Sequence, residues 1–325
     1  MKVAILGAGN IAGTMATTMK GIKDSTIVLY AVASRDKKKA EQFAKEHQIE
    51  KFYGSYEEML QDDQVDLVYV ATPHSHHYDH MKLCLNYGKH ILCEKSFTIN
   101  EKQAKEIFDL AKEKGVLVTE AIWTRYMPSR KMICDILTSG IIGKVHSLQA
   151  NLGYELQNIE RMIRPELAGG ALLDLGVYPI NFAMMIFGDN IKAMNSTAVM
   201  SEKGIDLMDS ITLYWEDNKT AVLHATMMTP TDRRGVIFGE KGYLVVNNIN
   251  NPESLEVYSR EHELLKKYEI PKQITGYEYE VYACAEAIKA GRLECEDMTH
   301  EQTLAVMKIM DAIREQWGMK FPMEL

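Results

Sequence analysis

Cysteine is scarce in the chain and its positions form no pattern. The five cysteines, Cys84, Cys93, Cys134, Cys284 and Cys295, are odd in number and scattered, and no two of them form a Cys-x-x-Cys pair. Such spacing excludes the disulfide framework that staples small secreted domains, and it does not suggest a zinc site. We therefore expect reduced thiols in the core.

Positive charge is also in deficit. The chain has 37 Lys and Arg against 45 Asp and Glu, a formal net charge of -8. Nucleic acids and anionic membranes require clustered positive charge, so neither is an expected partner. No uninterrupted apolar run approaches the roughly 18 residues of a membrane helix. The first predicted strand begins at Lys2 and leaves no room for a signal peptide, so we expect a cytoplasmic protein.

The first part of the chain alternates apolar strands with helices. Strands are predicted at 2–6, 27–33, 65–71, 91–93 and 116–119, and helices at 36–47, 56–61 and 100–114. This alternation predicts a parallel sheet of about six strands joined by crossover helices. In such sheets, ligands bind at the carboxyl ends of the strands.

A glycine-rich turn follows the first strand at once. Its sequence is Gly7-Ala8-Gly9-Asn10-Ile11-Ala12, and a predicted helix runs from there to about Lys20. The G-x-G-x-x-A pattern is typical of a dinucleotide-binding loop, in which the glycines let the backbone approach a pyrophosphate at a helix N-terminus. Because the required strand and helix flank it, we predict a Rossmann domain with cofactor contacts at Gly7, Gly9, Asn10, Ile11 and Ala12.

The end of the second strand bears on the choice of cofactor. A carboxylate there would accept the ribose 2′-hydroxyl of NAD, whereas the hydroxyl of Ser34 and the guanidinium of Arg35 suit a 2′-phosphate. These residues favour NADP(H), while Asp36 close behind them leaves NAD(H) possible. Arg35 is also consistent with an ordinary surface residue.

A second set of candidate cofactor contacts ends the strand at 65–71. Thr72, Pro73 and His74 follow that strand, and we expect His74 beside the nicotinamide. His76 and His80 follow on the next helix at a spacing that suits a metal. No Cys or carboxylate completes a tetrahedral set at the usual spacing, so no metal site is predicted.

The composition changes after about residue 122. Strands are predicted at 145–154, 191–200, 209–216, 220–228, 233–239, 242–247 and 255–258, and helices at 277–290 and 300–317. The predicted fold class is α/β. A Rossmann domain with a parallel sheet spans residues 1–122, and an α/β domain with an open, mostly antiparallel sheet spans residues 123–325.

The second sheet also predicts assembly. Both faces of the strand at 220–228 are largely apolar, while Ile211, Leu213 and Trp215 share one face of the strand before it. A sheet covered by helices on one side would expose the other, so we expect a second subunit to cover it. The predicted state is a homodimer, or a homo-oligomer built from dimers, with residues 123–325 binding the substrate and the partner.

Four side chains in the second domain and one lysine in the first are candidates for chemistry. A hydride moving between a nicotinamide and a carbonyl carbon requires a proton to move on the oxygen. Tyr178 can transfer that proton if a cation such as Lys95 lowers its pKa. Asp174 precedes Tyr178 by one helical turn and would orient substrate hydroxyls. Arg161 and Arg164 are candidates for substrate binding, and the sequence is equally consistent with two ordinary exposed arginines.

Together these motifs resemble the glucose-fructose oxidoreductase, inositol dehydrogenase and MocA family. The similarity covers essentially the whole chain and rests on four segments: Gly7 to Ala12, Ala71 to Pro73, Gly88 to Lys95 and Gly169 to Tyr178. It implies a Rossmann domain and a second domain whose open sheet often mediates dimers. It also assigns Glu94 and Lys95, from the family's Glu-Lys-Pro motif, to the nicotinamide site. Ser96 stands where the family has proline.

Within the family, the segment from Glu120 to Arg125 and the tyrosine at 178 most resemble the dimeric dihydrodiol dehydrogenase branch, also called D-xylose dehydrogenase (NADP). That branch implies cofactor contacts at Trp123 and Arg125 and a proton donor at Tyr178. The expected activity is hydride transfer between NADP(H) and a secondary alcohol or carbonyl of a sugar-like polyol or cyclic diol.

Two alternatives remain open at this point. The first is a non-catalytic regulator that binds the dinucleotide, because the family includes transcriptional co-regulators. The second is a glycosidase-like enzyme that uses bound NAD transiently. The presence of both Lys95 and Tyr178 favours the oxidoreductase over the regulator.

Overall fold

The computed structural model describes all residues 1–325 and divides into two compact units. Unit 1 comprises Met1–Tyr126 and Gln273–Leu304, and unit 2 comprises Met127–Lys272 and Ala305–Leu325. The segment Gln273–Leu304, which the sequence analysis placed in the second domain, thus packs with unit 1. The domain boundary after residue 122 stays a prediction.

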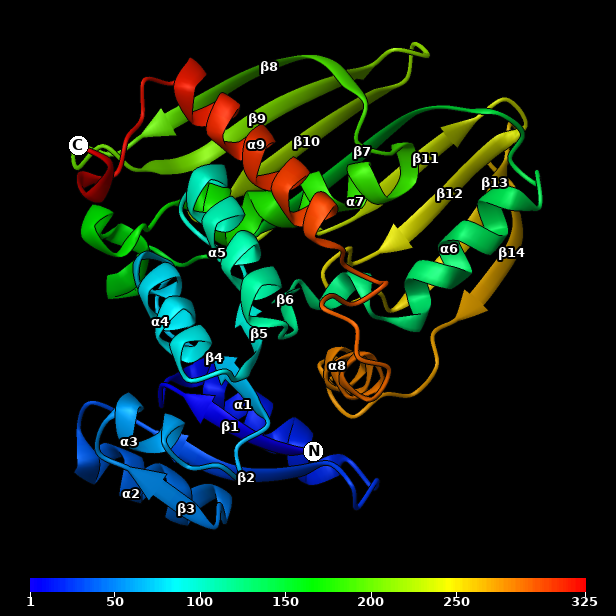
Figure 1. The fold of residues 1–325 in the computed structure, drawn as a ribbon. Coiled ribbons are helices and arrows are strands. Elements are labelled where there is room, and N and C mark those ends of the chain that lie inside the picture. The colour runs from blue at the N-terminus through cyan, green and yellow to red at the C-terminus, as the bar shows by residue number, and fades with distance from the viewer. The chain divides into compact units, whose positions relative to one another are not determined.

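Unit 1 is built on a six-stranded parallel sheet with the order β3-β2-β1-β4-β5-β6 (Figure 1). The strands are β1 (Lys2–Leu6), β2 (Val28–Ala33), β3 (Lys51–Tyr53), β4 (Leu67–Val70), β5 (His90–Glu94) and β6 (Val118–Ala121). The chain runs outward from β1 in one direction to β3 and then from β4 in the other direction to β6. The switch point between β1 and β4 is where such sheets bind dinucleotides.

The helices of unit 1 are α1 (Asn10–Gly21), α2 (Lys37–His47), α3 (Tyr56–Leu60), α4 (His74–Asn86), α5 (Glu101–Lys114) and α8 (Glu278–Lys289). Their ends follow from local chemistry. Asn100 accepts the Gln103 N–H at 3.0 Å and so caps α5. Gly115, with φ of +67°, ends that helix in the left-handed conformation.

Unit 2 contains an eight-stranded sheet with the order β14-β13-β12-β11-β7-β10-β9-β8 (Figure 1). Only the β7–β10 pair is parallel. The strands are β7 (Val145–Gly153), β8 (Ile191–Met200), β9 (Asp206–Trp215), β10 (Thr220–Thr226), β11 (Gly235–Gly239), β12 (Gly242–Asn247), β13 (Ser254–Ser259) and β14 (Leu264–Glu269). The predicted fold class is therefore confirmed.

The edge strand β14 is the one strand of this sheet that the sequence analysis missed. Its sequence, LLKKYE, does not alternate, and five of its six residues are exposed. A strand with one neighbour and little burial leaves no period in the sequence. The other helices are α6 (Pro128–Thr138), α7 (Val177–Phe187) and α9 (His300–Gln316), and short 3-10 helices lie at Trp123–Arg125, Glu160–Ile163, Pro165–Leu167 and Pro322–Glu324.

The two faces of the second sheet differ. Helix α7 and the π-helical turn Leu172–Gly176 pack on β7 and β10, and they bury Ile211, Leu213 and Trp215 as predicted. On the opposite face Val222 is 48% exposed, and Tyr214 is exposed beside it. This second face combines apolar side chains with few charges.

The longest apolar helical stretch belongs to the core. Pro165–Phe187 is long and apolar enough to cross a membrane, with a mean hydropathy of 1.5, but 83% of that window is buried inside the fold. A core helix has this property. All five cysteines are free, and all but Cys134 are buried, as expected for core thiols.

Candidate active site

The glycine-rich loop of unit 1 leaves space for a phosphate. Gly7 has φ of +107°, and a Cβ on it would lie 2.8 Å from the Ala71 carbonyl oxygen. A Cβ on Gly9, by contrast, would meet no atom within 4 Å. Helix α1 begins there with no side-chain cap and no acidic residue in its first turn, so no side chain of that turn satisfies its first N–H groups or opposes an anion. A pyrophosphate at this loop stays a prediction.

In the turn after β2, the side chains of Ser34 and Asp36 accept hydrogen bonds from nearby backbone N–H groups. Asp36 caps α2, because its Oδ1 accepts the Lys38 N–H at 2.9 Å and the Lys39 N–H at 3.3 Å. Ser34 is buried and accepts the Asp36 N–H at 3.3 Å. The carboxylate is therefore engaged with its own helix, which leaves Arg35 as the charged side chain of the turn.

Arg35 lies beside α3. Burial raises the pKa of Tyr56, and the Arg35 guanidinium near its hydroxyl opposes that rise. Thr72 and His80 lie at the neighbouring strand end, with the Thr72 hydroxyl 3.0 Å from His80 Nδ1. His80 packs edge-on against Tyr56 at 4.8 Å between ring centroids. Arg35 and Thr72, two of the predicted cofactor contacts, are thus linked through Tyr56 and His80.

The Lys95 turn follows β5 and is held by buried groups. Lys95 itself is half-buried, whereas Ser96 and Phe97 are fully buried, and the Lys95–Ser96 peptide bond is cis. The Glu94 carboxylate accepts the Tyr69 hydroxyl, and its Oε2 lies 3.3 Å from the Lys95 N–H. These contacts restrict the direction in which the chain presents Lys95.

His77 links the Lys95 turn to the end of β4. Its Nδ1 lies 2.9 Å from the Ser96 carbonyl oxygen, and its Nε2 lies 2.7 Å from that of Thr72. Burial lowers the pKa of His77 to about 4. His74 is buried at the first position of α4, following the N-cap Pro73. The strand ends that carry Thr72 and Lys95 are therefore tied together by one side chain.

Glu120 supports the same turn from β6, and the sequence analysis did not single it out. It accepts the Phe97 N–H at 3.1 Å and the Thr303 hydroxyl at 3.2 Å. Burial raises its pKa to about 7, and Arg125 is among the groups that oppose the rise. Arg125 is itself buried, and Trp123 stacks on Tyr277 at 4.2 Å between centroids. Tyr277 is distant in sequence, and no motif in the sequence pointed to its place beside Trp123.

In unit 2, Asp174 and Tyr178 lie on one continuous helical segment. The segment begins as the π-helical turn Leu172–Gly176 and continues as α7. Val177 donates its N–H to the Leu172 carbonyl five residues earlier. Pro179, which lacks an N–H, is thereby accommodated in the first turn of α7. The helix runs to Phe187, and it begins before Pro179 with a widened turn.

Three glycines permit this turn to pack closely. A Cβ on Gly169 would lie 2.6 Å from the Arg161 carbonyl oxygen, and one on Gly170 would lie 2.2 Å from Asp206 Oδ1. A Cβ on Gly176 would lie 3.3 Å from Asp209 Oδ2. The glycine-rich run noted in the sequence therefore serves close contact with the backbone and with two buried carboxyl groups.

The structure brings together two of the predicted substrate residues. Arg161 Nη1 and Nη2 lie 3.1 Å and 3.3 Å from the two carboxylate oxygens of Asp174. Asp174 is buried and Arg161 is partly exposed, so the guanidinium is the part of this pair that solvent can reach. Tyr178 is buried on the same helix.

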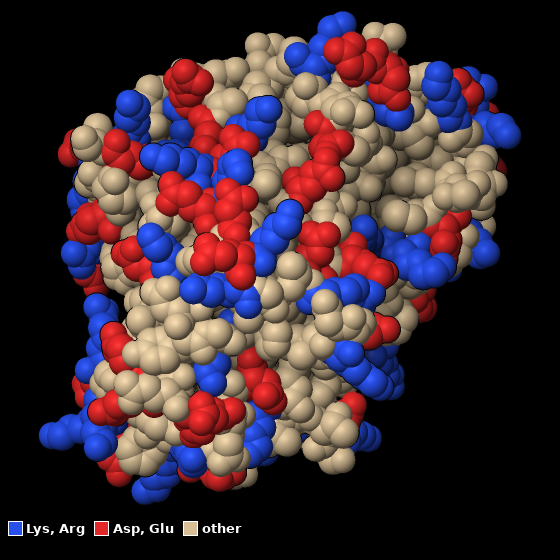
Figure 2. All heavy atoms as spheres, viewed as in Figure 1, with Lys and Arg blue, Asp and Glu red and all other residues tan.

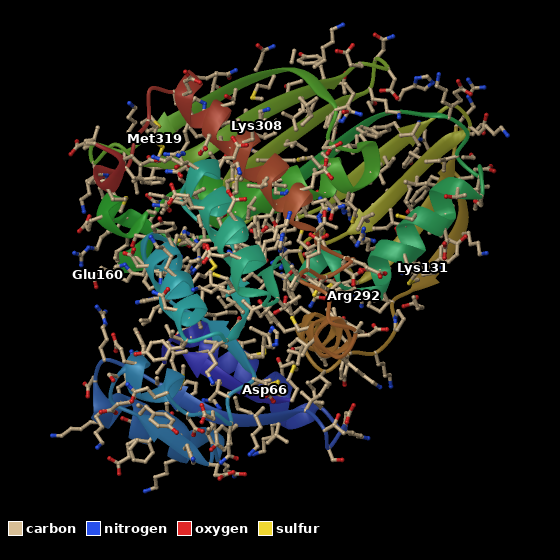
Figure 3. All side chains as sticks on the ribbon, viewed as in Figure 1. Asp66, Lys131, Glu160, Arg292, Lys308 and Met319 are labelled. Carbon is tan, nitrogen blue, oxygen red and sulfur yellow. The ribbon has the colours of Figure 1, made fainter.

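Arg164 is engaged differently. Its guanidinium donates to Glu160 and Glu166, each at 2.6 Å, and Glu160 is labelled in Figure 3. Arg164 is about as exposed as Arg161, but its partners are surface carboxylates. Its assignment to the substrate stays a prediction.

No group of three or more His, Cys, Asp or Glu side chains is arranged to hold a metal ion. The surface in Figure 2 intersperses Lys and Arg with Asp and Glu over the face shown.

Two family models match the chain. The model described as "Oxidoreductase family, NAD-binding Rossmann fold" matches residues 1–122, and the model of the GFO/IDH/MocA C-terminal domain matches residues 131–245. Each match falls on one of the two sheets.

Proteins of known name are similar over the whole chain. A trans-1,2-dihydrobenzene-1,2-diol dehydrogenase of Xenopus tropicalis is 32% identical over 99% of each sequence. One of Mus musculus is 29% identical, over 100% of this chain and 99% of the mouse protein. A 3-ketoreductase of Actinomadura kijaniata, solved with NADP and TDP-benzene, has a TM-score of 0.89 over 97% of each chain at 24% identity, and this similarity supports the fold.

Proposed function

Because the chain belongs to the Gfo/Idh/MocA family of oxidoreductases, we propose that it transfers hydride between NADP(H) and a secondary alcohol or carbonyl of a sugar-like polyol or cyclic diol. The family membership confirms the predicted resemblance. The observation that carries the finer proposal is the helix of unit 2 that fixes Tyr178 and Asp174 on one buried segment, with Arg161 on the Asp174 carboxylate.

The proposed cofactor residues are those of unit 1. The loop Gly7 to Ala12 would hold the pyrophosphate, Ser34 and Arg35 the 2′-phosphate, and the remaining predicted contacts the nicotinamide half. These remaining contacts are Thr72, Pro73, His74, Glu94, Lys95, Trp123 and Arg125. When bound, the nicotinamide supplies or accepts the hydride. The engagement of Asp36 with α2 supports NADP(H) over NAD(H), because that carboxylate is not free to repel a 2′-phosphate from the turn.

The protein's own side chains would handle the proton and the substrate. In the reducing direction, Tyr178 donates its phenolic proton to the substrate oxygen, and it takes a proton back in the oxidising direction. Lys95 supplies a positive charge that stabilises negative charge on oxygen. Asp174 and Arg161 orient the hydroxyl groups of the substrate as acceptor and donor.

The substrate class draws support from the relatives. Those of highest similarity reported above are named for a diol of a six-membered ring, and a polyhydroxylated ring or chain presents the same vicinal oxygen pattern to a carboxylate and a guanidinium. The second alternative, a glycosidase-like enzyme, has no specific contact in its favour.

The test is a turnover screen with two variants. NADPH consumption and NADP reduction are measured across sugars, polyols, inososes and diols. Tyr178→Phe and Lys95→Met should each lower kcat by about 100-fold or more, because each removes a group used in proton transfer or charge stabilisation. NADPH binding, followed by fluorescence, should persist in Tyr178→Phe.

Tyr87→Phe is the matched control, because it removes a hydroxyl from an exposed tyrosine that has no role in the proposal. It should turn over like the wild type. Wild-type turnover by Tyr178→Phe contradicts the proposed role. A protein that binds NADPH but converts none of the panel would instead be a regulator.

We also propose that two copies of the chain associate through the exposed face of the second sheet. On this face Val222 and Tyr214 are exposed, and the residues paired with Val222 on the neighbouring strands are the uncharged Thr212 and Gln149. Exposed apolar surface of this kind is typical of an interface. The open sheet of the family is consistent with this assembly.

A further inference from the structure

A buried carboxylate outside the predicted site contacts the helical segment that carries Asp174 and Tyr178. Asp206 opens β9 and is 1% exposed. Its Oδ2 accepts the Leu172 backbone N–H at 2.5 Å. We propose that Asp206 is a positioning residue, which as a carboxylate caps the π-helical turn and so holds Asp174 and Tyr178 in their working orientation. This inference rests on the proposed function, since it takes Tyr178 as the proton-transfer group.

The helical segment needs a cap from elsewhere in the chain. The first N–H groups of any helix have no partner within it. Ala171 occupies the N-cap position and has no side-chain acceptor. Asp206 reaches this end from a strand 34 positions later in the sequence, as the Leu172 bond shows. A carboxylate there both satisfies an orphan donor and places negative charge at the positive end of the helix.

The contact is also shaped from the helix side. Gly170 has φ of +126°, and its Cβ position would lie 2.2 Å from Asp206 Oδ1. Only a residue without a side chain permits the carboxylate to approach this closely. The adjacent Gly169 brings the loop that carries Arg161 against the same turn. The position of Asp174, which pairs with Arg161, therefore depends on both contacts of the turn, the one with Asp206 and the one with the Arg161 loop.

The charge of Asp206 is set by groups on three elements. Burial raises its pKa to about 6, and the backbone N–H groups of Leu172 and Ala171 and the Arg314 guanidinium of α9 oppose the rise. Asp209 is a second buried carboxyl on the same strand. Burial, and then the charge of Asp206, raises the pKa of Asp209 well above its usual range. Asp209 therefore holds its proton more tightly than a solvent-exposed aspartate does.

A pH dependence follows from this arrangement. Above about pH 6 Asp206 is a carboxylate and accepts a charge-assisted hydrogen bond, which is roughly twice as strong as a neutral one. Below that pH it is a neutral carboxyl, and the cap weakens. We expect kcat to fall as the pH drops through about 6, towards the activity of an enzyme with a neutral group at this position.

The experiment compares two isosteric variants, Asp206→Asn and Asp209→Asn. Asp206→Asn should have a kcat about tenfold below wild type at pH 7.5, consistent with loss of a charge-assisted bond. It should lack the acid limb of the wild-type profile and keep the wild-type Kd for NADPH. Asp209→Asn changes the neighbouring buried carboxyl but leaves the bond between Asp206 and Leu172 in place, so it should keep both the wild-type kcat and the acid limb. Wild-type kcat and an unchanged acid limb in Asp206→Asn would overturn the inference.

The outcome separates this inference from the proposed function. If Tyr178→Phe loses turnover while Asp206→Asn does not, the proposed function stands and the positioning role fails. If Tyr178→Phe keeps turnover, the proposed function fails whatever Asp206 does. If Asp206→Asn does not fold, Gly170→Ala displaces the carboxylate from the other side, and a wild-type kcat in that variant would equally overturn the inference.

Discussion

Gly170→Ala offers the sharpest test of how the helical segment of unit 2 is held. Two costs apply. A left-handed backbone angle at a residue with a side chain costs about 1–2 kcal/mol. The added Cβ would lie 2.2 Å from Asp206 Oδ1, so the carboxylate must move and its bond to Leu172 at 2.5 Å is lost. A hydrogen bond to a charged group contributes roughly 1.5–3 kcal/mol. The expected loss in the free energy of unfolding is about 2.5–5 kcal/mol.

Gly188→Ala is the matched control. Gly188 lies in the same unit with φ of +81°, and a Cβ on it would meet no atom within 4 Å. It should cost only the backbone term, about 1–2 kcal/mol. The assay is urea unfolding followed by tryptophan fluorescence, with Trp215 and Trp317 as reporters in that unit. Equal losses in the two variants would refute the account of Gly170.

A double-mutant cycle sharpens the same prediction. In an Asp206→Ala background there is no carboxylate for the new Cβ to displace, so Gly170→Ala should cost no more than Gly188→Ala. The coupling free energy between positions 170 and 206 should then be about 2 kcal/mol, within the range for residues in direct contact. Additive losses would show that the strain at Gly170 has another source.

Three further predictions concern the cofactor, the pH and the assembly. Arg35→Ala should lower kcat/KM for NADPH by about 10–100-fold through loss of a charge-assisted contact and leave kcat/KM for NADH nearly unchanged. Lys45→Ala, on the helix α2 that follows Arg35, is the control and should change neither value. Equal losses with both cofactors would contradict the prediction. Burial raises the pKa of Glu120 to about 7, so the wild type loses stability as the pH rises through that value and the buried carboxyl loses its proton. Glu120→Gln carries no such proton, so its Tm should rise relative to the wild-type Tm between pH 5 and 8. Parallel curves of Tm against pH for the two proteins would contradict the prediction. Val222→Asp should convert a dimer to a monomer in light scattering while Val28→Asp, at 44% exposure in unit 1, does not; a wild type that is already monomeric at micromolar concentration would end the dimer proposal.

Five strands of the parallel sheet could be predicted from the sequence because they are largely buried and contain short apolar runs. The short edge strand β3 was not predicted, because its three residues, KFY, are not buried and form no apolar run. The glycine-rich loop, the Lys95 turn and the Asp174–Tyr178 helix were likewise placed, since each has a local signature. The strands of the second sheet followed from alternation, except β14, whose exposed edge position imposes no period.

The supporting carboxylates could not be predicted in the same way. Glu120 was noticed as part of a motif, but its role depends on the distant Thr303. Asp206 lies before the predicted start of its strand at residue 209, and its partner Leu172 belongs to another element. Two aspartates in one strand, both buried in the fold, were the available signal. Contacts that are remote in sequence leave no periodicity, so only the folded structure assigns them.

Unit 1 is formed from two stretches of chain that are far apart in sequence, and this affects when it can finish folding during synthesis. The outer strand β6 is completed by late residues, since Val118 donates to the Leu293 carbonyl at 3.1 Å and its own carbonyl lies 2.9 Å from His300 Nε2. Phe108 stacks on His300 at 3.9 Å, and Glu120 accepts from Thr303. A nascent chain of 122 residues therefore holds the dinucleotide loop but exposes the flank that these residues later cover. During synthesis this unit must wait for nearly the whole polypeptide to emerge from the ribosome before its last buried contacts form.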